Sequence, residues 1–323
     1  MDQPLVSIII PCFRQGQYLR AAIDSALGQG FPAVQVVVIN DGSDDRTDEV
    51  ARSYGERIRY IDQPNQGQAA ARNVGAIAST GTYLLFLDAD DKLHPNAVEW
   101  LVEAAGGRDD VLCAMGVEYF EQESVLYERK LPPKVPNLSA LLLTKNFAGP
   151  PCAFLCTRAR FESCGGFDTE LQGTEDWDLW ASLVFAGCEV VPVFRIGAYY
   201  RVHSTSWTRN QLRMGLQYAL YHRRVLARIR ENPERVAELG KLAADLSRDV
   251  RGQLADALWG IAYFCRNEGR YWSAFYFYLA SLRWGRLTAI VGIGKLIPHR
   301  LLRTSTDGRP SPLATLKKAG TTP

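Results

Sequence analysis

Short apolar runs alternate with segments of helical periodicity between residues 5 and 87. The runs Leu5–Ile10, Val34–Ile39 and Tyr83–Leu87 are apolar almost throughout, which is typical of strands buried on both faces. The segments between them predict helices at Tyr18–Leu27, Thr47–Tyr54 and Gln68–Ala78, and a weaker strand at Arg57–Ile61. This alternation predicts an α/β fold in which a mostly parallel sheet carries helices on both faces.

Helices become more frequent in the later part of the chain. Expected elements are a helix from Pro95 to about Ala105, strands at Val111–Phe120, Ser124–Lys130 and Glu189–Tyr200, and a helix at Glu175–Ala186. From about Asn210 to Ile297 the pattern is helical, and a break near Asn267–Gly269 resembles a single tetratricopeptide-like hairpin. We therefore expect a first domain over 1–208, a helical region over 209–303 and a disordered tail over 304–323.

Polar residues gather where the predicted strands end. Pro11, Asp41 and Asp88 stand at these ends, where parallel α/β sheets bind their ligands, so three loops should converge on one crevice. Asp88, Asp90 and Asp91 place three negative charges within four residues, and a hard divalent cation would offset their repulsion. Asp91 is alternatively a cap for the helix that follows, but capping does not explain Asp88 and Asp90 together.

Two further positions face the same crevice. Asp41 can accept a hydrogen bond from a ligand, whereas Ser43 or Asp44 is expected to cap the helix at Thr47. Arg72 lies on a helix of small residues beside the acidic crevice, where it can pair with an aspartate or with a phosphate.

Four ordered motifs carry a resemblance to a known family. They are Val6–Pro11 (VSIIIP), Asn40–Thr47 (NDGSDDRT), Asn65–Gly75 (NQG followed by ARNVG) and Phe86–Asp91 (FLDADD). Together they resemble the nucleotide-sugar half of family 2 glycosyltransferases, which have the GT-A fold. The resemblance continues through Gly165–Asp168, Thr174–Trp180 and Tyr200–His203, and so covers about the first 205 residues.

The resemblance implies inverting transfer of a sugar from a nucleotide diphosphate-sugar, with UDP-sugar favoured, in the presence of Mg²⁺ or Mn²⁺. By position, the donor-binding residues are Pro11, Phe13, Asp41, Asn65, Arg72 and Asp88, and the metal-binding residues are Asp90, Asp88 and His203. Asp176 would be the general base that inversion requires, and Glu175 would orient it or touch the acceptor. Without the resemblance, Glu175 and Asp176 would be ordinary favourable charges in the first turn of a helix.

The chain also departs from the family pattern. Cys12-Phe13-Arg14 stands where a tyrosine and an asparagine are common, so stacking on a base is kept and a tyrosine hydroxyl contact is lost. Asn40 stands where a second aspartate is common, and Ser182 where an arginine is common. A Q-x-x-R-W motif is absent from the sequence, which argues against a processive polysaccharide synthase.

Charge divides the chain into an acidic and a basic part. Residues 1–200 hold 16 Lys and Arg against 27 Asp and Glu, a net charge of −11, whereas residues 201–323 hold 21 against 8, a net charge of +13. A metal suits the first part, and anionic lipid or phosphate suits the second. Leu287–Ile297 is apolar with basic flanks and far shorter than a membrane span, so contact with an anionic membrane surface stands beside simple packing as an expectation.

Cellular setting and partners follow from the same features. Seven scattered cysteines without a CxxC pair, and no basic and apolar leader, predict reduced thiols in the cytoplasm, at the inner face of the membrane if the basic region binds lipid. The expected partners are a carbohydrate or lipid-linked acceptor and no nucleic acid, in cell-surface polysaccharide or glycolipid assembly.

Two other classes of protein compete with this interpretation. A nucleotidyltransferase would usually carry a glycine-rich basic loop after the first strand, and residues 11–16 (PCFRQG) lack that richness. A non-catalytic scaffold or binding protein on a glycosyltransferase fold is disfavoured because Asp88, Asp90 and Asp176 are all present.

Overall fold

The computed structural model describes residues 3–121, 126–147, 149–203, 210–241 and 243–284. The chain forms two compact units, Met1–Arg209 with Arg224–Ser247, and Asn210–Arg223 with the chain from Arg248 onward. The expected boundary at residue 208 stays a prediction, and the expected tail lies outside the described residues.

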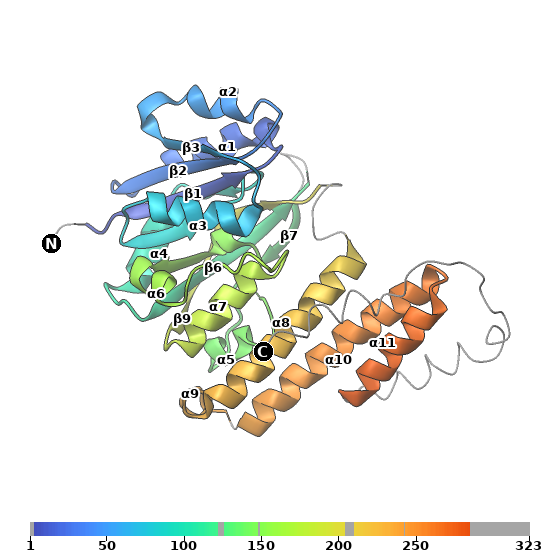
Figure 1. The fold of residues 1–323 in the computed structure, drawn as a ribbon. Coiled ribbons are helices and arrows are strands. Elements are labelled where there is room, and N and C mark those ends of the chain that lie inside the picture. The colour runs from blue at the N-terminus through green and yellow to red at the C-terminus, as the bar shows by residue number, and fades with distance from the viewer. Residues whose placement is uncertain (1–2, 122–125, 148, 204–209, 242, 285–323) are drawn as a thin grey trace. The chain divides into compact units, whose positions relative to one another are not determined.

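A nine-stranded mixed sheet forms the centre of the first unit, in the order β3-β2-β1-β4-β8-β6-β9-β5, with β7 paired to β6 (Figure 1). The strands are β1 Val6–Cys12, β2 Val34–Asp41, β3 Arg59–Gln63, β4 Tyr83–Phe86, β5 Lys92–Leu93, β6 Val111–Phe120, β7 Leu126–Lys130, β8 Phe154–Thr157 and β9 Glu189–Arg201. Parallel pairs join β1 to β2 and β4, β2 to β3, and β6 to β9. The expected α/β class with a mostly parallel central sheet and C-terminal helices is confirmed, whereas the antiparallel strand β8 between β4 and β6 was missed.

Helices cover both faces of the sheet. They are α1 Gly16–Leu27, α2 Thr47–Arg52, α3 Gln68–Ala78, α4 Ala97–Ala105, α5 Leu138–Leu142, α6 Arg158–Ser163 and α7 Glu175–Phe185. Later in the chain come α8 Gln211–Glu231, which begins in the second unit and ends in the first, and α9 Pro233–Glu238. Gln29, just after α1, accepts a hydrogen bond from the backbone of Val98 in α4, so these two helices share one face. Arg158 of α6 donates to the carbonyl of Ala76 in α3, which places these two on one face, and Figure 1 shows α3 in front of the strands.

Strand β1 runs past its expected end. It continues through Pro11 to Cys12, and Pro11 lies opposite Ile39 of β2. Strand β4 pairs with β1 only as far as Ile9, so β1 has a free edge beyond that point, and proline is tolerated there because no ladder bond is lost. The sheet is therefore stepped at the edge where β1 and β2 end and the loop after β4 turns.

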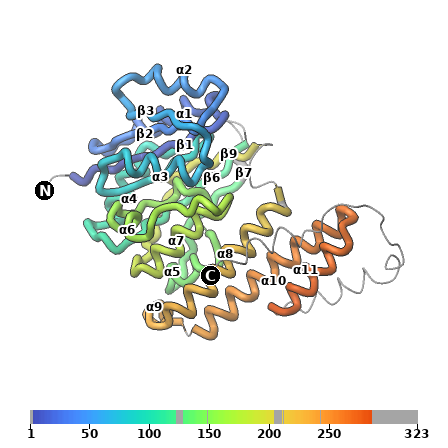
Figure 2. The backbone as a smooth tube through the Cα atoms, in the orientation of Figure 1, coloured from blue at the N-terminus to red at the C-terminus, as the bar shows by residue number. Residues whose placement is uncertain are grey.

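The second unit contains the predicted helical hairpin except for the first residues of α10; the two helices are α10 Ala243–Asn267 and α11 Tyr271–Arg283, whose traces run side by side in Figure 2. Its core contains Ile261, Ala262, Cys265, Ala274 and Tyr278. The aromatic residues along α11 differ in burial: Tyr278 is buried in this core, whereas Tyr271 is 36% exposed. In the described residues no helix is long and apolar enough to cross a membrane, and the segment 287–297 lies outside that part of the chain.

Candidate functional site

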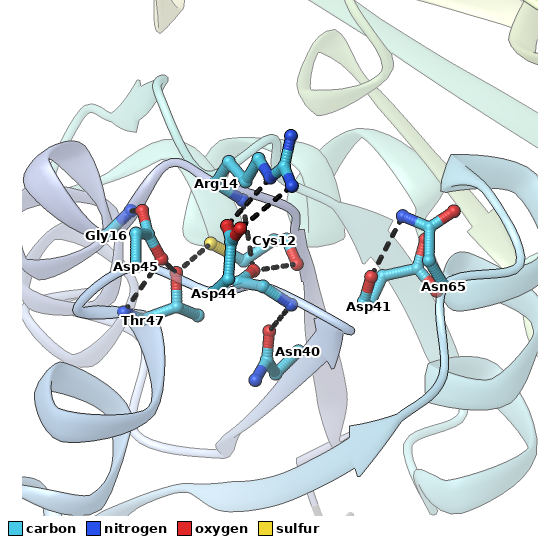
Figure 3. A network of polar contacts seen from close by, with 10 residues as sticks. Cys12, Arg14, Gly16, Asn40, Asp41, Asp44, Asp45, Thr47 and Asn65 are labelled. Carbon is cyan, nitrogen blue, oxygen red and sulfur yellow. Dashed lines mark hydrogen bonds and ion pairs between the residues drawn. The ribbon is translucent and has the colours of Figure 1, made fainter.

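The loops after β1 and β2 are tied together by side chains (Figure 3). The side-chain oxygen of Asn40 accepts a 3.0 Å hydrogen bond from the backbone of Ser43, whose hydroxyl accepts one of 3.0 Å from the backbone of Arg14. Asp45, rather than Ser43 or Asp44, accepts hydrogen bonds from the backbone N–H groups of Thr47 and of Gly16. The expected cap was therefore assigned to the wrong neighbour, because only the Asp45 carboxylate reaches the starts of both helices.

Asp41 is the centre of the next loop. Its two carboxylate oxygens accept hydrogen bonds of 2.9 Å from the backbone of Gln66 and of Gly67, and one of 2.7 Å from the Gln63 side chain. The Asn65 amide donates back to the backbone carbonyl of Asp41 at 3.0 Å, and Figure 3 shows the two residues facing each other. Asp41 is thus buried and shapes the loop of residues 63–67.

Gly42 lets this loop approach. Its φ of +73° is unfavourable for residues with a side chain, and a Cβ placed there would lie 2.7 Å from the backbone nitrogen of Asn65. The NDG sequence therefore meets two requirements. Gly42 allows the backbone conformation, and the Asp41 carboxylate holds the loop of residues 63–67.

Arg72 links α3 to two acidic segments. Its guanidinium donates a 2.7 Å hydrogen bond to Asp88 after β4 and a 2.9 Å hydrogen bond to Glu175 at the start of α7, and it lies over the Phe167 ring at 5.2 Å. Burial lowers the pKa of Arg72, but the charges of Asp88 and Glu175 outweigh burial and raise it overall. The prediction that Arg72 pairs with an aspartate at the crevice is borne out by this geometry.

Asp90 and His203 place two atoms side by side that could both bind a metal cation. Asp90 Oδ2 and His203 Nε2 lie 2.8 Å apart, and Gln15 donates to the same oxygen at 3.0 Å. Burial raises the pKa of Asp90, and the nearby charge of Asp88 adds to this, while the hydrogen bond with His203 opposes it. A cation beside Asp90 would offset both unfavourable effects.

This pair fits a hard divalent cation. Neighbouring ligands of an octahedral Mg²⁺ at about 2.1 Å lie about 3 Å apart, close to the separation of Asp90 Oδ2 and His203 Nε2. Within the described ranges, no group of three His, Cys, Asp or Glu side chains could hold a metal ion. Such a cation would therefore draw its other ligands from phosphate oxygens and water, as Mg²⁺ usually does.

Asp91 has a structural role that differs from the expected helix cap. Its side chain is buried and accepts a 2.9 Å hydrogen bond from the backbone of Arg201 in β9. The Arg201 guanidinium donates in turn to the backbone carbonyl of Asp90 at 3.0 Å. Asp91 and Arg201 thus join the acidic loop to the strand that leads to His203.

The first turn of α7 carries the candidate base. Glu175 is buried between Arg72 and the backbone of Gly173, from which it accepts a 2.5 Å hydrogen bond. Asp176 is half-buried and accepts a 2.7 Å hydrogen bond from the backbone of Trp177. Burial raises the pKa of Asp176 to about 7, with a further contribution from Glu175, while Arg72 opposes the shift. A carboxyl group with this pKa can accept a proton at neutral pH.

The expected residues occupy one edge of the sheet in three linked groups. Asp88, Arg72 and Glu175 form one, Asp90 with His203 a second, and Asp41 with Asn65 the third. Phe13 stays apart from these contacts; it is 42% exposed, with Arg14 over its ring at 5.1 Å. Sequence reasoning missed Gln15, Gln68 and Phe167, which contact Asp90, Asp88 and Arg72, because only the fold brings them to these charged residues.

Solved structures share this architecture. S. aureus TarS 1–349 in complex with UDP-GlcNAc has a TM-score of 0.64 and 16% identity, and the match covers 90% of this chain and 89% of that one. Mannosyltransferase PcManGT from Pyrobaculum calidifontis, in complex with GDP-Man and Mn²⁺, has a TM-score of 0.57 and 16% identity, covering 91% and 79%. At these identities the likeness shows the fold alone, and the fold is of the GT-A type.

Sequence relatives define the family. The profile described as Glycosyl transferase family 2 matches residues 7–164. An uncharacterized glycosyltransferase of Rickettsia prowazekii (strain Madrid E) is 34% identical over 221 residues, which cover 65% of this chain and 68% of the relative. The uncharacterized glycosyltransferase EpsJ of Bacillus subtilis (strain 168) is 37% identical over 124 residues, covering 38% of this chain and 36% of the relative. The chain belongs to glycosyl transferase family 2, as its motifs indicate.

Proposed function

We propose that this glycosyltransferase moves a sugar, with inversion, from a nucleotide diphosphate-sugar to an acceptor hydroxyl in cell-surface polysaccharide or glycolipid assembly. The observation that carries the proposal is the junction at Arg72, which joins Asp88 beyond β4 to Glu175 beside the candidate base. It brings the end of the nucleotide-binding sheet and the start of α7 to one place. The nucleotide-sugar ligands of TarS and PcManGT support a donor of this class, and we favour a UDP-sugar.

The donor would lie along the ends of β1, β2 and β4. Phe13 offers an exposed ring on which a nucleobase can stack, and Pro11 stands two residues before it, near the end of β1. A nucleobase N–H can replace the Gln63 amide on Asp41 while the two backbone hydrogen bonds to Asp41 keep the loop in place. Asn65 and Arg72 complete the proposed contacts with the nucleoside and its phosphates.

A divalent cation, Mg²⁺ or Mn²⁺, would be held by Asp90 and His203 with Asp88 nearby. When bound, it supplies positive charge that stabilises the nucleoside diphosphate as leaving group. The Mn²⁺ bound in PcManGT supports this assignment. The single positive charge of Arg72 offsets one of the two negative charges of Asp88 and Glu175, so a donor diphosphate meets less negative charge than the number of carboxylates suggests.

Asp176 would act as the general base. An acceptor hydroxyl that attacks the face opposite the leaving group must lose a proton, and a carboxylate with a pKa of about 7 accepts it efficiently near neutral pH. Glu175 is fixed by Arg72 and by the backbone of Gly173, so it orients the first turn of α7 rather than receiving the proton.

Contact with an anionic membrane surface is part of the proposal, because the acceptor class includes lipid-linked sugars. Helix α11 exposes Trp272 (71%), Tyr276 (47%) and Leu279 (46%), which recur at helical spacing and lie between the basic residues Arg270 and Arg283. Aromatic side chains flanked by basic ones are typical of helices that lie in a membrane interface. Sedimentation with anionic vesicles should fall after Trp272→Ser and Tyr276→Ser, and unchanged sedimentation would remove this part of the proposal.

The experiment that tests the function combines binding with turnover. UDP and GDP are titrated into the protein by calorimetry with Mn²⁺, and the matching nucleotide-sugars are then assayed for release of nucleoside diphosphate. Nuclear magnetic resonance of the glycoside product reads whether the anomeric configuration is inverted. Binding of one nucleotide with slow donor hydrolysis supports the proposal. Nucleotide binding without sugar transfer to any acceptor tested indicates a scaffold. Release of pyrophosphate from a nucleoside triphosphate indicates a nucleotidyltransferase.

A further inference from the structure

The helix that carries the candidate base is held at its first turn by a later segment of the same compact unit. Both Nη atoms of Arg228, in α8, donate 2.9 Å hydrogen bonds to the two carboxylate oxygens of Asp178. Arg224, one turn earlier, lies 3.8 Å from Asp178 and pairs with Asp168 at 2.5 Å. Asp178 is only 4% exposed, so its position depends on these arginines. Paired arginine hydrogen bonds of this kind fix direction as well as distance.

The other end of α7 is held by the same segment. Arg235, in α9, donates from Nε to the carbonyl of Val184 at 2.9 Å and from Nη2 to the carbonyl of Cys188 at 3.1 Å. The last carbonyl groups of a helix have no partner within the helix. The Val184 carbonyl already accepts a hydrogen bond from the backbone of Gly187, and the guanidinium of Arg235 adds a side-chain donor that ties this end of α7 to α9. One arginine therefore fixes the start of α7 and another fixes its end.

The corner between α8 and α9 sets the distance between these two arginines. Asn232 lies at this corner, and both its backbone N–H and its side-chain amide donate to the carbonyl of Arg228 at 2.9 Å. The Asn137 side chain donates to the carbonyl of Leu239, just after α9, and so ties this segment to the start of α5. The segment of residues 224–239, called here the α8–α9 brace, is a fixed support rather than a linker.

The brace also divides the charges of the first turn of α7. Glu175 is paired with Arg72 and Asp178 with Arg228, whereas Asp176 has no ion pair in the described part of the chain. The two flanking carboxylates are anchored from different directions. Asp176, between them, is therefore the carboxylate that is available to a substrate.

We propose that Arg228 and Arg235 are positioning residues for sugar transfer, which hold α7 along its axis and so fix Asp176 against the donor. This proposal rests on the proposed function of Asp176. The brace lies beyond residue 205, outside the segment that resembles the family and outside the 7–164 match, so the motifs of the catalytic domain give no indication of it.

The test compares Arg228→Gln, Arg228→Lys and Arg235→Gln with Arg230→Gln, an exposed arginine of α8 that makes none of these contacts. Hydrogen-exchange rates of the amides in 175–185 measure directly how firmly α7 is held. The kcat is calculated per UDP-binding site, so that loss of folded protein does not count as loss of rate. The KM for the donor is measured in the same assays. A misplacement of about 1 Å costs roughly 100-fold in rate, so we expect a 10- to 100-fold fall in kcat for Arg228→Gln.

Further expected results are donor KM within about two-fold of wild type, faster exchange in 175–185 and intermediate values for Arg228→Lys, whose single ammonium keeps charge without the paired geometry. Exchange and kcat equal to those of Arg230→Gln would overturn the proposal. So would a fall in UDP-binding stoichiometry with kcat per site unchanged, because the brace would then be merely structural. A wild-type protein that binds UDP but transfers no sugar defeats the proposed function instead, and the exchange measurement still decides whether the brace holds α7.

Discussion

Arg72 and Glu175 are 103 residues apart in the sequence, and the guanidinium of the first donates a 2.9 Å hydrogen bond to the carboxylate of the second. The contact joins α3, which packs on the nucleotide-binding strands, to α7, which carries the candidate base. The same guanidinium holds Asp88 at 2.7 Å. One buried cation therefore couples the proposed donor side of the site to the proposed acceptor side.

Replacing Arg72 with methionine should destabilise the protein. The substitution leaves Asp88 and the buried Glu175 without their counter-charge, and breaking a buried ion pair by removing one partner costs about 3–5 kcal/mol. Urea denaturation measures the free energy of unfolding. Arg52→Met is the control, because Arg52 pairs with Asp48 at the surface, where solvent screens the charges and such pairs add little to stability. Equal losses for the two variants would contradict the role given to Arg72.

The rate of sugar transfer should rise with pH through about 7. The pKa of Asp176 is raised to about 7 by burial and by Glu175, and only the deprotonated carboxylate can accept a proton. The profile of kcat/KM against pH for the wild-type protein measures this directly, and Asp176→Asn should lose transfer activity by about 100-fold or more while still binding UDP. A profile without an inflection between pH 5 and pH 8 would argue against Asp176 as the base.

The same pKa shift has a consequence for stability with the opposite sign. The folded protein holds the Asp176 proton more tightly than the unfolded chain, in which aspartate has a pKa of about 3.9. Asp176 therefore lowers the free energy of unfolding progressively as pH rises from about 4 to 7. Asp176→Asn should remove this slope and be more stable than wild type at pH 8. Denaturation curves at pH 5 and pH 8 check the difference, with Asp109→Asn at an exposed position as control.

Asp90→Ala should abolish the effect of Mn²⁺ on nucleotide binding. The substitution removes one of the two adjacent donor atoms at the proposed cation site, and His203 alone is a weak ligand for Mg²⁺ or Mn²⁺. Calorimetric titration of UDP with and without Mn²⁺ should give the same affinity in this variant. Glu103→Ala removes an exposed carboxylate on α4 and should bind as wild type does. If the UDP affinity of Asp90→Ala still depends on Mn²⁺ as it does in the wild-type protein, the cation does not bind at Asp90.

Gly75→Ala should weaken the packing of α3 on the sheet. A Cβ at this position would lie 2.4 Å from Ile9 and 2.5 Å from Ile39, so the helix or the strands must move, and overpacking of this kind costs about 1–3 kcal/mol. Gly260→Ala is the matched control, because a Cβ there meets nothing within 4 Å in α10, and alanine stabilises a helix over glycine by about 0.5–1 kcal/mol. In thermal unfolding, Gly75→Ala should lower the Tm and Gly260→Ala should raise it.

The sequence predicted the elements around the site well because their patterns are local. The spacing of small and apolar residues placed α3 at Gln68–Ala78, and the apolar run of β6 was placed at Val111–Phe120. Strand β8 was missed because Phe154–Thr157 closely follows a proline pair, which indicates a break in regular structure rather than a strand. The cap of α2 was assigned to Ser43 or Asp44 instead of Asp45, and Asp91 was offered as a helix cap although it binds the backbone of Arg201. Neighbouring polar residues look alike in sequence, and only the path of the loops decides which one reaches a backbone N–H.

The sequence by itself determined the α/β class, the position of the acidic cluster after β4 and membership of the family, because alternation of elements and ordered motifs are written along the chain. Only the tertiary structure decided which charges neutralise each other. It paired Arg72 with Asp88 and Glu175, and Arg228 with Asp178, and it left Asp176 between two anchored carboxylates. The reason is physical: a charge buried in the fold must find its partner in space, and these partners come from segments up to 103 residues apart.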